Sequence, residues 1–180
     1  MTRAGLLRLS TAFVASVCLS GLVASAQGGG RYSAALAGDQ EVPAVSTVAS
    51  GEFTLDIDED GQEIAYELSY SGLQGTIRQA HIHFGQPGVV GGIVLWLCDS
   101  ATNNSPVEST PACPQSGTVS GTLIPSDVQG TAANTQQINA GEFAEAVAFI
   151  KKGLGYANVH TSLTPGGEIR GHVRQGGGHK

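Results

Sequence analysis

Positive charge and aromatic side chains are scarce in this chain of 180 residues. Lysine and arginine together number 9 against 15 aspartates and glutamates, and aromatic residues make up 6% of the sequence. The formal net charge of −6 would repel the phosphates of nucleic acids and anionic membrane surfaces. We therefore expect no nucleic acid partner, and an extracellular protein or a small ligand instead.

Long apolar runs are also rare, and the longest lies near the N-terminus. Arg3 and Arg8 precede an apolar stretch from Leu9 to Val23, and the small residues Ala24-Ser25-Ala26 follow it. This order is typical of a secretory signal peptide that is cleaved before Gln27. We expect a signal peptide over residues 1–26, no membrane span elsewhere, and a secreted protein, periplasmic or extracellular.

Cysteine occurs three times, and cleavage of the signal peptide would remove Cys18. Cys98 and Cys113 would then form an even pair in a protein bound for an oxidising compartment. Such a pair usually forms a disulfide, whereas a thiolate metal site is the less common alternative. We predict a structural disulfide that stabilises the fold by about 3 kcal/mol through loop closure.

Glycine triplets flank the rest of the chain at residues 28–30 and 176–178. Triple glycine has a high unfolded-state entropy and orders only through strong contacts. We expect a flexible N-terminal segment over residues 27–31, one domain over residues 32–174 and a flexible tail over residues 175–180.

Short segments in which apolar and polar residues alternate dominate this domain. Such alternation indicates strands with one buried face, and many short strands separated by glycine predict an antiparallel β-sandwich or a flattened Greek-key barrel. Trp96, the only tryptophan, lies in the most apolar segment and is expected in the core. The expected strands cover residues 32–37, 53–57, 64–70, 77–84, 93–97, 118–124, 156–161 and 168–174.

One segment departs from this pattern and predicts a single short α-helix over about residues 139–152. Phe143, Val147 and Ile150 recur at helical spacing. Asn139 with Glu142 three residues later resembles a capping box at the start of a helix. We expect this helix to pack against the strands.

Three histidines are the strongest indication of chemistry in the sequence. His81 and His83 alternate along one predicted strand, and His160 lies on another. Because alternate side chains of a strand project to the same side, three imidazoles can converge on one ion, and imidazole-rich sites suit copper or zinc. His172, which shares the face of His160, is a weaker additional ligand. The alternative is that these are surface or second-layer histidines that hydrogen-bond to loops.

Three further polar residues are predicted to support such a metal site. Arg170 would lie beside the ligands as a cation that attracts anions. Glu168 or Asn158 would orient a ligand imidazole through a hydrogen bond.

A second set of residues matches a calcium-binding loop at each prescribed position. Asp56, Asp58, Asp60, Gly61 and Glu67 have the spacing of an EF-hand loop. The flanking residues alternate with period two instead of forming the helices that an EF-hand requires, which argues against calcium.

Several ordered motifs resemble those of the CHRD domain, the module named after chordin. This resemblance implies a secreted, β-rich binding domain whose biochemical role is unassigned, and the segment from Cys98 to Cys113 resembles bacterial members. The motifs are Leu36-Ala37-Gly38-Asp39-Gln40-Glu41-Val42-Pro43, Ser50-Gly51, Tyr66-Glu67-Leu68-Ser69-Tyr70-Ser71-Gly72-Leu73, Ala80-His81-Ile82-His83, Asn158-Val159-His160-Thr161 and Pro165-Gly166-Gly167-Glu168-Ile169-Arg170-Gly171.

A looser resemblance is to copper-zinc superoxide dismutase, a β-sandwich enzyme in which a His-x-His pair and a late histidine hold copper. His81, His83, His160 and Arg170 follow each other in that order, but residues 85–117 contain no histidine for that enzyme's other ligands. The expected function is a CHRD-type binding module with a three-histidine metal site. A dismutase-like copper enzyme and a metal-independent matrix or adhesion domain are the alternatives.

Overall fold

The computed structural model describes residues 1, 29–100, 105–131 and 135–176. Apart from Met1, the predicted signal peptide lies outside the described residues, as does the tail beyond Gly176. Within the described ranges, each helix is too short or too polar to cross a bilayer.

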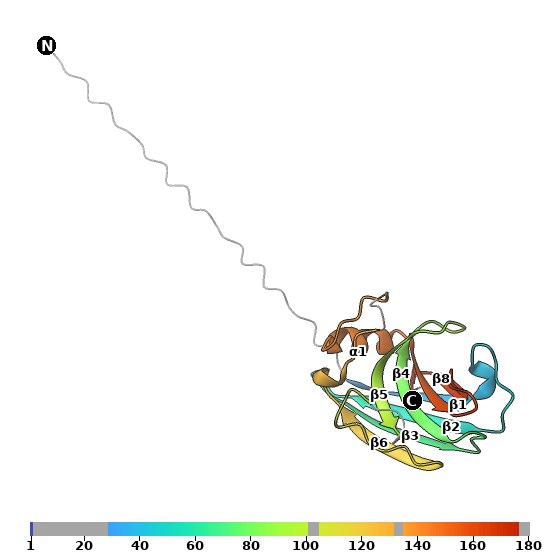
Figure 1. Cartoon of the computed structure of the whole chain (residues 1–180). Coiled ribbons are helices and arrows are strands. Elements are labelled where there is room, and N and C mark those ends of the chain that lie inside the picture. The colour runs from blue at the N-terminus through green and yellow to red at the C-terminus, as the bar shows by residue number, and fades with distance from the viewer. Residues whose placement is uncertain (2–28, 101–104, 132–134, 177–180) are drawn as a thin grey trace.

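In the described part of the chain, eight antiparallel strands form a nearly closed barrel (Figure 1), in the order β5-β4-β7-β8-β1-β2-β3-β6. This confirms the predicted mainly β fold, with the barrel as the alternative that the chain adopts. A short ninth strand, β9, pairs with β1. The strands are β1 (Gly30–Ala37), β2 (Ser50–Ile57), β3 (Ile64–Ser71), β4 (Ile77–Phe84), β5 (Gly92–Asp99), β6 (Gly117–Leu123), β7 (Gly155–Thr161), β8 (Ile169–His172) and β9 (Arg174–Gln175).

The barrel interior holds the apolar residues that alternate along the strands. Phe53 of β2 lies opposite Leu68 of β3, and neither side chain is exposed to solvent. Burial of one such side chain contributes about 1.5–3 kcal/mol. At the seam between β5 and β6, Tyr66 donates a hydrogen bond to the carbonyl of Leu97 over 2.6 Å. This bond links β3 to β5, so the two ends of the strand order stay close together.

The helix α1 (Phe143–Lys151) begins four residues later than its sequence pattern predicts. Asn139 and Glu142 form half of the expected capping box, since the Glu142 carboxylate accepts from the backbone and side-chain amides of Asn139, whereas the Glu142 amide donates to the backbone carbonyl of Asn139. Gly141 lies between them at φ +83°, which is not a helical conformation, so this capping pair belongs to a turn before the helix. Phe149 then stacks on Phe84 at the end of β4, where the helix covers one end of the barrel (Figure 1).

The ends of the domain extend slightly beyond the predicted boundaries. Gly30 pairs with Ile57 and Arg31 with Asp56, so the last two residues of the expected flexible segment 27–31 belong to β1. At the other end, Gln175 belongs to β9 and pairs with Tyr32. Backbone hydrogen bonding along both edges of β1 thus orders residues next to the glycine triplets.

The predicted disulfide between Cys98 and Cys113 is present. Cys98 is fully buried near the end of β5, and the following residue, Asp99, forms a parallel bridge with Ala112. The disulfide therefore fixes the segment that leads from β5 toward β6, and it suggests folding in an oxidising compartment.

Candidate metal centre

The three candidate histidines lie on adjacent strands and on the same side of the sheet. His81 and His83 belong to β4, and His160 of β7 is paired with Gln79, two residues before His81. Residues paired across antiparallel strands point to the same face, and so do residues two apart on one strand. One ring nitrogen from each histidine lies within 4.8 Å of the other two. This juxtaposition is the one that the sequence pattern predicts.

The histidine face lies outside the barrel, yet it is covered by connecting segments. A row of paired residues runs across the outer side of four neighbouring strands. Its members are Ala37 of β1, Arg170 of β8, Asn158 of β7 and His81 of β4. His81 is 0% exposed, and His83 and His160 are 5% exposed. Residues 41–49, 85–91 and 162–167 cover the row, as the hydrogen bonds described below show.

Backbone carbonyls hold two of the imidazoles. Nδ1 of His83 lies 3.0 Å from the carbonyl oxygen of Gly91, and Nδ1 of His160 lies 3.0 Å from that of Pro165. A carbonyl only accepts hydrogen bonds, so each Nδ1 carries the proton and each Nε2 carries a lone pair. Neither ring nitrogen of His81 has a hydrogen-bond partner within the described residues. All three rings therefore keep a lone pair for another partner.

Two aromatic side chains pack against the imidazole rings of His83 and His81. Tyr156 stacks on His83 with the ring centroids 4.8 Å apart and the planes at 5°. Trp96 meets His81 edge-on with the centroids 4.2 Å apart. The expectation that Trp96 lies in the core is wrong, because irregular pairing of β4 with β5 places it opposite His81 on the outer face, where it is only half-buried.

Burial keeps the three imidazoles neutral. It is the main cause that lowers the pKa of His81 well below its usual value, and the neighbouring His160 and His83 lower this pKa further. Burial likewise lowers the pKa of His83 to about 3 and that of His160 to about 4. Metal ions bind the neutral form of imidazole, so the group is ready to bind an ion at neutral pH without losing protons.

Arg170 and Asn158 meet at a buried carboxylate that the sequence analysis did not single out as a site residue. Nε of Arg170 lies 3.1 Å from a carboxylate oxygen of Glu41, and Asn158 donates to the other oxygen over 2.6 Å. The guanidinium also lies over the Tyr156 ring at 4.7 Å. Burial raises the pKa of Glu41, although Arg170 and Asn158 oppose that shift. This cluster thus packs beside His83 through Tyr156.

Glu168 connects the covering segments to each other. Its carboxylate accepts hydrogen bonds from the hydroxyls of Thr47 and Thr161 and from the backbone amides of Gln74 and Gly75. Burial raises its pKa, but these hydrogen bonds together outweigh burial and lower it. Glu168 therefore supports His160 indirectly, through the neighbouring Thr161. The direct orienting bonds to the imidazoles come from backbone carbonyls, which no side-chain pattern reveals.

His172 does not join the three-histidine group. It pairs with Tyr156, and the Tyr156 ring lies between it and His83. Its ring centroid is 5.3 Å from that of Tyr156.

The residues of the calcium-like pattern lie in the β2–β3 hairpin. Strands flank this loop where an EF-hand has helices, and the Asp58 carboxylate accepts from the amides of Gln62 and Glu63 in the turn. Asp56 faces Arg31 at 4.0 Å on the surface. Among the described residues, only the histidine group brings three ligand atoms of this kind together.

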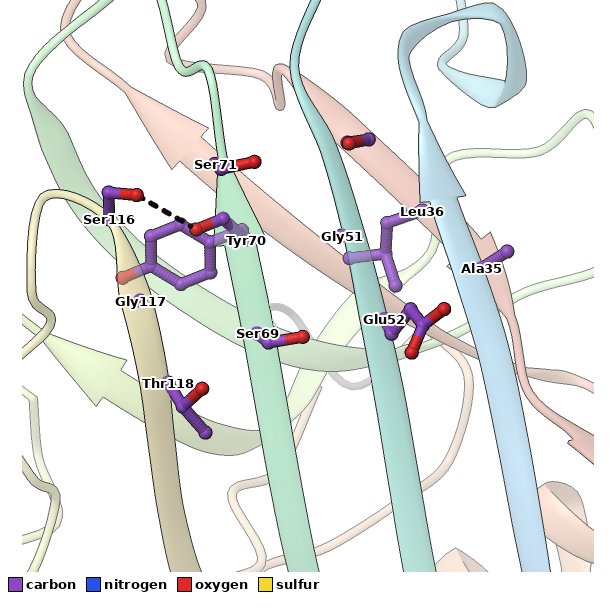
Figure 2. A pocket seen from close by; sticks show the side chains of 11 residues that line it. Ala35, Leu36, Gly51, Glu52, Ser69, Tyr70, Ser71, Ser116, Gly117 and Thr118 are labelled. Carbon is purple, nitrogen blue, oxygen red and sulfur yellow. Dashed lines mark hydrogen bonds between the residues drawn. The ribbon is translucent and has the colours of Figure 1, made fainter.

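The opposite part of the barrel carries a shallow hollow of about 480 Å³ across β1, β2, β3 and β6. Figure 2 shows Ser69, Ser71 and Thr118 along its neighbouring strands. Among the residues that line it, Glu52 has the one charged side chain. The hollow is thus a hydroxyl-rich surface on strands other than β4 and β7, which bear the histidines.

Comparison with known proteins bears on this arrangement. No curated protein and no solved structure matches the chain, so nothing supports the looser resemblance to copper-zinc superoxide dismutase or a bacterial type. The family model of the CHRD domain matches residues 32–173, which include all the strands from β2 to β8 and the three histidines. The chain belongs to the CHRD domain family.

Proposed function

We propose that this CHRD domain is a secreted metal-binding module that holds one transition-metal ion between His81, His83 and His160. The observation that carries the proposal is the contact between Nε2 of His83 and Nε2 of His160 at 3.4 Å. Both Nδ1 atoms donate to carbonyls, so both Nε2 atoms present lone pairs to each other. Two acceptors at this separation repel each other, and a cation between them turns that repulsion into two bonds.

The same separation suits ordinary metal geometry. Imidazole nitrogens bind zinc at about 2.0–2.1 Å, so two nitrogens 3.4 Å apart would enclose an angle of about 112° at the ion. This is close to the tetrahedral angle. His81 has no hydrogen bond to hold it in place, so its ring can rotate to complete the site.

Burial of unbonded polar atoms gives a second argument. A buried polar group without a partner costs about 1–3 kcal/mol, and native proteins contain few of them. Both ring nitrogens of His81 are buried and have no hydrogen-bond partner among the described residues. An ion bound to one of them would relieve part of this cost.

The donor set favours copper or zinc. Three imidazole nitrogens without a carboxylate suit these ions, whereas calcium and magnesium prefer oxygen ligands. The Arg170 guanidinium disfavours additional positive charge near His83, but its ion pair with Glu41 offsets much of that effect. We propose copper as the ion, with zinc as its competitor.

The test is titration of the purified, metal-free mature domain with Cu(II) and with Zn(II), followed by metal analysis. Trp96 lies against His81, so its fluorescence reports binding directly. We expect one ion per domain, and at least a hundredfold weaker binding in His81→Ala. His172→Ala is the matched control, since it removes a nearby histidine outside the group, and should bind as the wild type does.

Circular dichroism confirms that both variants are folded before they are compared. Binding that is unchanged in His81→Ala, or lost equally in both variants, would refute the site. Binding of zinc in preference to copper at equal free concentration would refute copper as the ion but leave the three-histidine site intact.

A further inference from the structure

The metal centre is closed in the described structure, so an ion reaches it only if a covering segment moves. The exposed fractions of the three histidines are 5% or less. Residues 85–91 and 162–167 contact them through the carbonyls of Gly91 and Pro165, and residues 41–49 cover the neighbouring Arg170 and Asn158. These three segments differ in what holds them in place.

Two of the segments are held by buried carboxylates. Residues 41–49 begin with Glu41, which is ion-paired with Arg170 and bonded to Asn158, and Thr47 donates to Glu168. Residues 162–167 form a turn in which the amide of Gly167 donates to the carbonyl of Thr164, and the carboxylate of Glu168 joins the two flanking residues by accepting from Thr161. Hydrogen bonds to charged groups are about twice as strong as neutral ones, so both segments resist opening.

The β4–β5 loop, residues 85–91, is held to the site by two neutral hydrogen bonds and one charge-assisted hydrogen bond. The amide of Gly91 donates to the Tyr156 hydroxyl over 3.0 Å, and its carbonyl accepts from His83. The Val89 carbonyl accepts a charge-assisted hydrogen bond from Arg170 over 3.0 Å, which is the strongest of these three contacts. Val89 and Val90 are 44% and 66% exposed, so the loop buries little apolar surface that opening would uncover.

Glycines give this loop backbone freedom at both ends and in the middle. Gly85 and Gly91 flank it, and Gly88 has φ +79°, a conformation that disfavours other residues. An added Cβ at Gly91 would collide with the Phe84 carbonyl, so the chain needs glycine there to close.

We propose that the loop Gly85–Gly91 is the gate through which the metal ion enters and leaves. This inference rests on the proposed metal-binding function. Opening detaches the Gly91 carbonyl from Nδ1 of His83, so the ligand nearest the loop becomes free to turn outward and take the ion first. When the loop closes again, that bond re-forms and the His83 ring returns to its stacked position on Tyr156. This movement of His83 brings the ion to His160 and His81.

Gly88→Ala tests the gate. A Cβ at Gly88 meets no atom within 4 Å, so the substitution adds only the strain of a left-handed backbone to the closed loop. That strain favours opening about five- to thirtyfold in both the free and the loaded domain. Gly166→Ala is the control on the other covering turn, since a Cβ there also meets nothing and its φ is unstrained.

Stopped-flow Trp96 fluorescence measures copper uptake, and a chelator challenge measures release. We expect both rate constants of Gly88→Ala to rise by the same factor, with an unchanged Kd, and those of Gly166→Ala to match the wild type. Equal rates in wild type and Gly88→Ala, or a changed Kd at an unchanged uptake rate, would overturn the gate.

Amide hydrogen exchange of the wild-type domain tests the same loop without a variant. We expect the amides of Val89 and Gly91 to exchange faster than those of Gly167 and Glu168, and to slow when copper is added. Slower exchange of Val89 and Gly91 than of Gly167 and Glu168 would contradict the gate even where copper binds. If the wild-type domain binds no ion at all, it is the proposed function that fails.

Discussion

Mild acid should strongly destabilise the metal-free domain. Lowering the pH from 7.5 to 5.5 crosses the usual histidine pKa of about 6.5 but stays above the range in which most carboxylates titrate. Burial lowers the pKa of His83 to about 3 and that of His160 to about 4, and it holds that of His81 well below its usual value. In this window the unfolded chain gains protons on these side chains, whereas the folded domain does not.

The sign and size of the effect follow from linkage. Since the folded pKa values are lowered, the full stability is present above pH 6.5 and is lost as the pH falls toward 4 and then 3. At pH 5.5, one unit below the unfolded value, each such histidine costs about 1.4 kcal/mol. Three of them together lower the free energy of unfolding by about 4 kcal/mol, a large part of the 5–15 kcal/mol that is typical of a domain.

Equilibrium urea unfolding at the two pH values, with a chelator present and at constant salt, measures this loss. His160→Asn removes one titrating ring, so its loss should be about 3 kcal/mol. Copper should stabilise the wild type about equally at the two pH values, because the folded imidazoles are neutral at both and bind the ion without losing protons. A loss below about 1 kcal/mol for the wild type would refute the claim that these rings are buried and neutral.

Three further outcomes follow from the contacts around the site. Glu168→Gln should lower the free energy of unfolding in urea at pH 7 by about 2 kcal/mol, because a buried carboxylate loses charge-assisted hydrogen bonds. Since the folded pKa of Glu168 is lowered, the difference between the variant and the wild type should shrink as the pH falls below about 4.3. Glu41→Gln should lower the free energy of unfolding by about 3–5 kcal/mol, because it leaves the Arg170 charge buried without its partner. The double variant, which combines Glu41→Gln with Arg170→Met, should recover part of that stability. Reduction of the Cys98 disulfide should lower the free energy of unfolding by about 3 kcal/mol, measured with and without dithiothreitol; no change on reduction would show that the loop it closes is already restrained in the unfolded chain.

The strands and the side on which the histidines lie were predictable because they depend only on period-two geometry. His81 and His83 alternate with Ala80 and Ile82, both of which are fully buried in the barrel core. The same alternation places Asn158 and His160 on one side of β7. Neighbouring pairing of β4 and β7 then brings the rings together.

The burial of that side was not predictable, because connecting segments without a regular pattern produce it. Carbonyl oxygens of Gly91 and Pro165 orient the rings, and every residue has such an oxygen. Glu41 could not have been singled out, because the exposed Asp39 precedes it by two residues and the sequence does not show which of the two is buried. Trp96 was misplaced since an almost entirely apolar strand has no alternation to follow, and irregular pairing shifts its side chain to the outside.

The pairing of β9 with β1 has a consequence for how this domain can be joined to other chains. Tyr32 and Gln175 are paired partners, and the amide of Gly176 donates to the carbonyl of Arg31, so the polypeptide enters and leaves the barrel at one place. A unit with such adjacent ends fits into a surface turn of a host protein with only short spacers. For the same reason the domain can be circularly permuted, with the old ends fused and new ends opened at the Asp58–Gly61 turn between β2 and β3, because the histidines belong to the other strands β4 and β7.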